Sequence, residues 1–204
     1  MILTAGLLQP LHNLLRDKLL SGPVIHCDET VVQVLKEPDK PPQSQSYMWV
    51  QAGGPPSRNI ILYDYHPSRS GQVPLRLLEG YRGYLMTDGY EGYNAIAAGD
   101  GMTHLCCWAH ARRKFVEAQR AQPKTKGAAK TGKVDVALNF IGKLYGIEQG
   151  LRGSDRETRY RIRQQDSVPV LEQLRLWLVN RWIRCCPKGN WVKRCSICTN
   201  TGPS

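Results

Sequence analysis

The stretch SGPVIHCDETVVQVL, residues 21–35, places two adjacent carboxylates inside a segment that otherwise has the composition of a buried strand. Apolar, mostly β-branched residues flank the pair on both sides, which predicts a strand over residues 24–35 that enters a hydrophobic core. Asp28 and Glu29 lie in the middle of that strand. Because a buried carboxylate is costly unless it has a partner, the pair needs a chemical reason to be there.

Similar signals continue on the C-terminal side of this strand. SYMWVQAG (46–53) and RNIILYDYHP (58–67) predict two more strands, and short turns between the three indicate an antiparallel meander. VPLRLLEGYRG (73–83) predicts a short helix, and YLMT (84–87) a fourth strand that ends at Asp88-Gly89. MTHLCCWAHARRKFVEAQ (102–119) predicts a fifth strand followed by a helix. Mixed strands with a parallel crossover predict an α/β layered fold.

Helical periodicity appears on both sides of this region. Leucines at about 3.6-residue spacing predict a helix over residues 5–20, and two further helices are expected over residues 134–151 and 154–179. No apolar run approaches the roughly 18 residues that span a bilayer, and the N-terminus lacks the pattern of a signal peptide. We therefore expect a cytoplasmic protein that does not contact a membrane.

Charge is distributed unevenly along the chain. The total net charge is +11, with 28 Lys and Arg against 17 Asp and Glu. Residues 1–111 are nearly neutral, whereas residues 112–204 carry the entire positive excess. Such asymmetry is typical of proteins that bind a polyanion such as nucleic acid, although a solvated basic surface would give the same count.

The two aspartates Asp28 and Asp88 suggest a metal site. The meander brings the fourth strand back beside the first, so the two carboxylates would lie at matching heights on neighbouring strands. They would repel each other unless a cation lay between them, and Mg²⁺ takes one or two protein carboxylates in this way. On this interpretation Asp28 is buried because it must hold a metal ion rigidly. The residues alone leave two alternatives open: Asp88-Gly89 as a simple turn, and Asp28 as the partner of an arginine.

Five motifs in order then resemble a known family. HCDETVVQVL, YMWVQAG, ILYDYHPSRSG, YLMTDGYEGYN and CCWAHARRKFVEA are similar to the catalytic core of transposases of the insertion-sequence-66 family. The resemblance, over residues 5–179, implies a ribonuclease-H-like fold with a helical insertion after the core, and a catalytic Asp-Asp-Glu triad. It also implies Mg²⁺ or Mn²⁺ as cofactor, and DNA at transposon ends and target sites as partner.

The same resemblance assigns roles to individual residues. Asp28 and Asp88 match the first two catalytic and metal-binding carboxylates, while Glu29 is a family-like neighbour outside the triad. The basic motif after the fifth strand implies contacts to DNA by His110, Arg112, Arg113 and Lys114, and Arg69 in PSRSG is a further candidate. Two other interpretations stay open: Cys107 and His110 could bind zinc, or Cys107 and Trp108 pack in the core while Arg112 and Arg113 lie in solvent.

The third carboxylate of the family is absent from its expected place. No Asn-Arg-Ala-Glu-like motif is present, and Glu172 lies in sequence that resembles the inserted helices. We therefore expect an N-terminal helix (1–20), a partial catalytic core (21–120), a basic loop and helical insertion (121–179) and an aberrant tail (180–204). The expected activity is weak or absent, and the alternative is a regulatory, non-catalytic protein that binds DNA.

The tail has a different composition from the rest of the chain. Four of the seven cysteines, Cys185, Cys186, Cys195 and Cys198, lie in its last 20 residues. They could form a zinc site, but adjacent cysteines are poor ligands for one ion. We prefer the hypothesis that a frameshift has truncated a transposase, which the nucleotide sequence around codon 180 would test. The resemblance implies association with DNA in the bacterial nucleoid, and it leaves open assembly with further copies of the chain or with other proteins of the same element.

Overall fold

The computed structural model describes residues 2–97, 101–121 and 132–185. The chain divides into two compact units, residues 1–107 and 108–204. The boundary between them falls directly after the fifth strand, so the helix that we placed at the end of the core groups with the helices that follow it. The zinc and frameshift hypotheses concern a tail whose residues from 186 onward lie outside the described residues.

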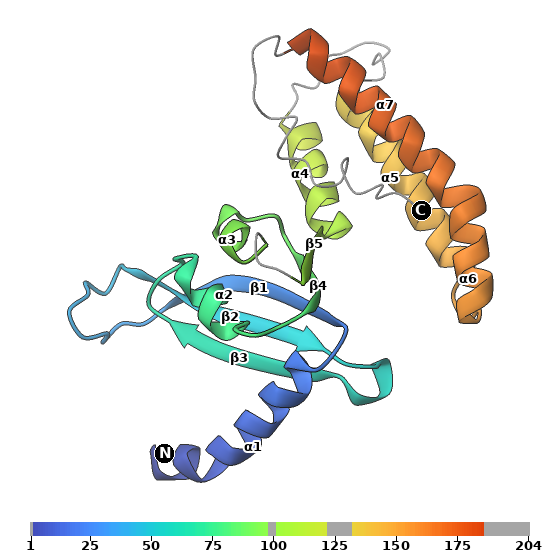
Figure 1. The fold of residues 1–204 in the computed structure, drawn as a ribbon. Coiled ribbons are helices and arrows are strands. Elements are labelled where there is room, and N and C mark those ends of the chain that lie inside the picture. The colour runs from blue at the N-terminus through green and yellow to red at the C-terminus, as the bar shows by residue number, and fades with distance from the viewer. Residues whose placement is uncertain (1, 98–100, 122–131, 186–204) are drawn as a thin grey trace. The chain divides into compact units, whose positions relative to one another are not determined.

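The first unit is built on a mixed five-stranded sheet (Figure 1). Its strands are β1 (Val24–Gln33), β2 (Gln45–Gly53), β3 (Ile60–His66), β4 (Gly83–Thr87) and β5 (Met102–Cys106). They lie in the order β3-β2-β1-β4-β5. The first three strands form an antiparallel meander, and β4 and β5 are added in parallel. The predicted α/β fold class is confirmed, and the sheet is consistent with a ribonuclease-H-like fold.

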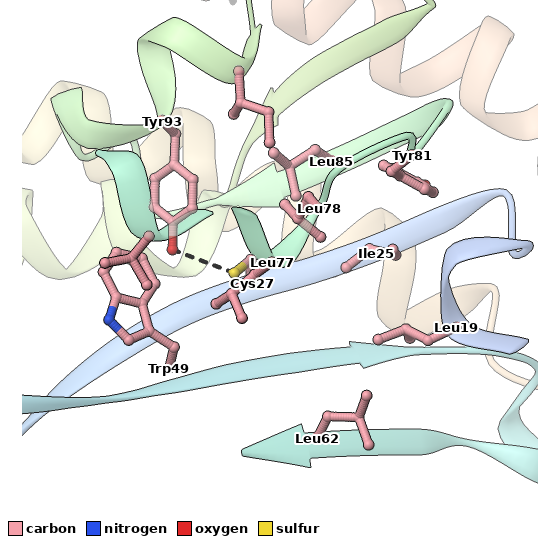
Figure 2. Close-up of a cluster of buried hydrophobic side chains, with 12 residues drawn as sticks. Leu19, Ile25, Cys27, Trp49, Leu62, Leu77, Leu78, Tyr81, Leu85 and Tyr93 are labelled. Carbon is pink, nitrogen blue, oxygen red and sulfur yellow. Dashed lines mark hydrogen bonds between the residues drawn. The ribbon is translucent and has the colours of Figure 1, made fainter. Parts of the chain in front are cut away.

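Helix α1 (Ile2–Leu20) precedes the first strand. Short helical elements connect the later strands: η1 (Pro56–Arg58), α2 (Gln72–Leu77), η2 (Glu91–Tyr93) and α3 (Asn94–Ala97). One face of the sheet, together with α2 and η2, forms the hydrophobic core. Figure 2 shows Ile25, Cys27 and Trp49 on the strands and Leu78 and Tyr93 on the connecting segments directed into this cluster. Trp49 and Tyr93 are fully buried and meet edge to face, with ring centroids 6.0 Å apart.

Strand β1 is buried on one face only. Ile25 and Cys27 are buried, whereas Asp28 between Cys27 and Glu29 is exposed. Alternate residues of a strand point to opposite faces, so the core side continues from Ile25 and Cys27 to Glu29. The expectation that Asp28 is buried was therefore wrong. The strand also leaves the core after Glu29: Val31 is 53% exposed and the strand ends at Gln33.

Helix α1 forms as predicted, but its apolar stripe does not enter the core. Leu7, Leu11 and Leu14 are each more than half exposed, and among residues 6–20, whose burial the structure describes, only Leu19 is buried. Arg16 anchors the helix to the sheet through an ion pair with Asp64 of β3 at 2.8 Å. The leucine spacing thus predicted the helix correctly but not its degree of burial.

The second unit is helical. It consists of α4 (Trp108–Arg120), α5 (Lys133–Gly150), α6 (Arg156–Ile162), a π-helical turn η3 (Arg163–Ser167) and α7 (Val168–Cys185). Residue Asp155 caps α6 by accepting the Thr158 N–H at 2.9 Å. Among the described helices, none combines the length and apolar character needed to cross a bilayer.

Candidate active site

Asp28 lies in the middle of the central strand. Its side chain is on the face of the sheet opposite Ile25 and Cys27, and it is exposed. The Asp28 Oδ1 atom accepts the backbone N–H of Glu29 at 3.0 Å, which restricts the orientation of the carboxylate. A strand in the centre of a sheet is a rigid support for a catalytic group.

Asp88 directly follows strand β4. The parallel ladder between β1 and β4 pairs Val24 with Tyr84, Ile25 with Leu85 and His26 with Met86, and ends there. If the same register continued for two more residues, Asp88 would lie level with Asp28; β4 itself ends at Thr87 and its pairing with β1 ends at Met86.

A tight turn fixes the backbone at Asp88. Gly89 adopts a φ of +87°, a conformation that glycine tolerates best. The Asp88 Oδ1 atom accepts the Tyr90 N–H at 2.8 Å, as in an Asx-turn. Asp88 is half-buried, and its side-chain direction is determined by this turn rather than by strand alternation.

Glu29 is the buried carboxylate of this region. Its side chain is only 1% exposed, and both oxygens have donors. The Arg69 Nε and Nη2 atoms donate to Glu29 Oε1 at 2.8 and 2.6 Å, and the Tyr93 hydroxyl donates to Glu29 Oε2 at 2.8 Å. Burial raises the pKa of Glu29, whereas hydrogen bonds from Arg69 and Tyr93 and the charge of Arg69 act in the opposite direction; the nearby Asp88 charge adds to the increase.

Arg69 connects Glu29 to the turn at Asp88. Its guanidinium lies over the ring of Tyr90, 3.9 Å from the centroid. The Tyr90 hydroxyl donates to the backbone carbonyl of Arg69 at 2.9 Å. In the structure the Arg69 Nε and Nη2 atoms donate to the buried Glu29 carboxylate, and the Arg69 side chain is 41% exposed; its contact with DNA stays a prediction.

Two further side chains near the site have perturbed pKa values. Burial is the main reason that the pKa of Cys27 is raised to about 12, so this thiol is not a nucleophile at neutral pH. Burial also lowers the pKa of His104, which favours the neutral imidazole. The His104 Nε2 atom lies 2.7 Å from Thr87 Oγ1, which in turn accepts the Gly89 N–H. These contacts support the turn from β4 into Asp88.

The other predicted DNA-binding residues belong to the second unit. Arg112, Arg113 and Lys114 on α4 are exposed, and His110 is half-buried. Lys114 forms a long surface ion pair with Glu117, at 3.6 Å, which contributes little to stability. A groove of about 450 Å³ runs along α4, and its lining includes Arg112 and Arg113.

A comparison with known families identifies the chain. The family model described as Transposase IS66 family matches residues 1–200. The chain belongs to the IS66 transposase family. This confirms the resemblance predicted from the five motifs.

Curated relatives of this IS66 transposase-family chain come from one bacterium. Uncharacterized protein y4jD of Sinorhizobium fredii (strain NBRC 101917 / NGR234) is 30% identical over 184 residues, which are 85% of this chain and 34% of the relative. Uncharacterized protein y4hP of the same strain is 29% identical over 183 residues, 84% of this chain and 33% of the relative. The chain thus spans about a third of the length of the curated relatives that it matches. No solved structure matches it.

The two aspartates suit a hard divalent cation. Mg²⁺ binds through one or two carboxylates and keeps several water ligands, so an exposed Asp28 and a half-buried Asp88 have the right chemistry. Glu29 does not, since both of its oxygens accept hydrogen bonds inside the protein. In residues 2–97, 101–121 and 132–185, no three His, Cys, Asp or Glu side chains are grouped so as to hold a metal ion.

The buried position of Glu29 and its pairing with Arg69 were not predicted, because the motif alone marks Glu29 only as a neighbour of the triad. Strand alternation offered the missing signal, since a residue two positions after Cys27 shares its buried face. An acidic residue on a buried face requires a cationic partner. Nothing in the spacing identified Arg69 as that partner, because the two residues are 40 positions apart in sequence.

Proposed function

We propose that this chain is part of a DNA transposase catalytic core, in which Asp28 and Asp88 hold Mg²⁺ or Mn²⁺ for cleavage and transfer of DNA strands. The observation that supports the proposal is the parallel pairing of β1 with β4 up to His26 and Met86, two residues before Asp28 and Asp88, in a chain of the IS66 transposase family. When bound, the ion supplies Lewis-acid activation of the attacking oxygen and neutralises charge at the phosphate.

The residues of the chain supply the geometry for this reaction. Asp28 is fixed on a central strand and by the Glu29 N–H, and Asp88 is fixed by the Tyr90 N–H. Preorganised carboxylates avoid reorganisation when the substrate binds. The neutral His104 and the protonated Cys27 are assigned no part in proton transfer.

DNA is the proposed partner, and the second unit carries most of the positive charge that would bind the DNA phosphates. Helix α4 has four basic residues and one acidic residue, and the residues lining its groove include Arg112, Arg113 and Arg120. Guanidinium groups bind phosphate oxygens in a bidentate manner. Contacts of this kind position the duplex without reading its sequence. Transposon ends, other proteins of the element and further copies of the chain are proposed partners of the intact relatives.

A cleavage assay tests the catalytic proposal. Supercoiled plasmid is incubated with the purified chain and Mg²⁺ or Mn²⁺, and nicked DNA is measured over time. Cleavage is expected to be weak, because the third carboxylate is absent from its expected place, to require the metal, and to be lost in Asp28→Asn and in Asp88→Asn. Asp17→Asn, on an exposed position of α1, serves as the matched control. Metal-dependent cleavage that survives both catalytic substitutions would refute the assignment.

A second function is favoured by one observation. The described residues contain no group of three potential metal ligands, whereas the family uses three carboxylates. The chain would then bind DNA without cutting it and would regulate transposition by occupying DNA sites. Salt-dependent DNA binding that is the same in the wild type, Asp28→Asn and Asp88→Asn, with no cleavage in any of them, would support this alternative.

A further inference from the structure

The backbone ladder that joins the two aspartate-bearing strands ends before it reaches the aspartates. The last pair of β1 and β4 is His26 with Met86, two residues short of Asp28 and Asp88. Hydrogen bonds between the strands therefore do not set the spacing of the two carboxylates. Something else must hold the strand ends together, since the site needs a defined separation to bind one ion.

A continuous series of side-chain contacts spans this gap. It begins at Glu29, whose backbone N–H is bound by Asp28. The Glu29 carboxylate holds the Arg69 guanidinium at 2.6 and 2.8 Å. The Arg69 guanidinium stacks on the ring of Tyr90, and the backbone carbonyl of Arg69 accepts a hydrogen bond from the Tyr90 hydroxyl. Tyr90 ends the series, because its N–H is bound by Asp88.

Close backbone packing locks the same two loops together. A Cβ atom added at Gly71, next to the Arg69 loop, would lie 2.7 Å from the carbonyl oxygen of Gly92 in the Tyr90 turn. No side chain fits between them. Arg69 and Tyr90 are thus held in register by their backbones as well as by their side chains, which gives the series little freedom to shift.

We propose that Glu29, Arg69 and Tyr90 form a clamp that positions Asp28 relative to Asp88. The inference rests on the proposed function, because the clamp matters for metal binding only if the two aspartates share an ion. Glu29 and Arg69 are positioning residues, since neither needs to touch the metal or the DNA. Glu29 is suited to this role because its carboxylate is enclosed and both oxygens are occupied within the protein.

Two amides report directly on the two aspartates. The N–H groups of residues 29 and 90 are bound by Asp28 and Asp88 respectively, so their hydrogen exchange reflects the position of each carboxylate. In the metal-free protein, the double variant Glu29→Gln/Arg69→Ala is expected to speed exchange of both amides about tenfold or more, the factor that accompanies loss of a hydrogen bond to a charged group. Exchange is measured by NMR.

Two sheet amides show whether the effect is local. The Tyr84 N–H donates to Pro23 O at 2.9 Å and the Cys107 N–H donates to Thr87 O at 2.8 Å, at the two ends of β4. Both are expected to exchange at the wild-type rate in the double variant. Equal acceleration of all four amides, or no acceleration at residues 29 and 90, would overturn the clamp. Arg76→Ala, at an exposed arginine of α2, is the control and should change none of them.

The double substitution removes the buried Glu29 charge together with its partly exposed cation Arg69, because Arg69→Ala alone would leave a buried carboxylate without its cation and could unfold the unit. Tyr90→Phe offers the same test without altering a charged residue. It removes the hydroxyl that donates to the Arg69 carbonyl, and it is expected to speed hydrogen exchange of the residue 90 amide. If the double variant does not fold, the Tyr90→Phe result decides, and an unchanged rate overturns the proposal.

Mn²⁺ titration followed by electron paramagnetic resonance separates the clamp from the proposed function. Wild-type protein should bind Mn²⁺, Asp28→Asn should not, and the double variant should bind about tenfold more weakly. Wild-type affinity in the double variant would overturn the clamp. Failure of the wild type to bind Mn²⁺ would instead refute the proposed metal chemistry, while the amide rates would still decide whether the clamp holds the two aspartates.

Discussion

Removal of one hydroxyl group at Tyr93 should destabilise the first unit measurably. Tyr93 is fully buried, and its hydroxyl donates to Glu29 Oε2 at 2.8 Å. Tyr93→Phe keeps the ring and its packing, so it creates almost no cavity. It leaves one oxygen of a carboxylate that is 1% exposed without its donor.

The expected cost follows from the nature of the acceptor. Hydrogen bonds to charged groups contribute about 1.5–3 kcal/mol, and the burial of Glu29 excludes water that could replace the lost donor. At about 1.4 kcal/mol per factor of ten, the open form of the unit should become about 10- to 140-fold more populated.

Cys27 provides the assay. Its thiol is 2% exposed, so an alkylating reagent reaches it only when the unit opens. The rate of alkylation of the peptide that contains Cys27, followed by mass spectrometry under native conditions, measures the free energy of opening without interference from the helical unit. Tyr93→Phe should accelerate this rate by the factor given above.

Tyr81→Phe is the matched control. Tyr81 is 4% exposed, and its hydroxyl donates to a neutral acceptor, the carbonyl of Tyr84, at 3.0 Å. Loss of a hydrogen bond between neutral groups costs about 0.5–1.5 kcal/mol, or about 2- to 12-fold in rate. If Tyr93→Phe accelerates alkylation no more than Tyr81→Phe does, the argument that Glu29 is a buried charge supported by this hydroxyl is wrong.

Three further outcomes are expected. Trp49→Ala, at a fully buried core residue, should destabilise the first unit by about 3–5 kcal/mol in the same assay. Asp155 has a lowered pKa, chiefly because the Thr158 N–H binds its carboxylate. The cap therefore stabilises α6 fully above the unfolded-state pKa of about 3.9, and this stabilisation is lost as the pH falls through the folded-state pKa. Hydrogen exchange of the Thr158 amide, measured between pH 6 and pH 2, would show the loss. Arg112→Gln and Arg113→Gln should each weaken DNA binding at all sequences alike and reduce the salt slope by about one, measured by fluorescence anisotropy.

Much of the sheet could be predicted because its strands carry their own signals. The alternation in SYMWVQAG and RNIILYDYHP, with short turns between them, specified the meander. The break at Asp88-Gly89 marked the end of β4, since the turn needs the positive φ of glycine. These features depend on residues that are close in sequence, which is why they could be recognised without coordinates.

What could not be predicted depends on partners far away in the chain. Leucine spacing in α1 predicted an amphipathic helix, but whether Leu7 or Leu14 is covered depends on what packs against it. The role of Arg69 depends on Glu29, which is 40 residues away. A pattern shows which residues share a face, but not which other segment covers that face. The same reason explains why α4 was grouped with the core rather than with the helices.

The two neighbouring carboxylates of β1 differ by a single methylene, and this difference protects the strand against misalignment. A slip of one residue would turn Asp28 inward and Glu29 outward, because every side chain would change sides. The shorter aspartate would then have to span the gap to Arg69 and Tyr93, which the glutamate bridges with bonds of 2.6 to 2.8 Å. A shift of β1 by one residue would therefore lose the contacts that hold Glu29 to Arg69 and Tyr93.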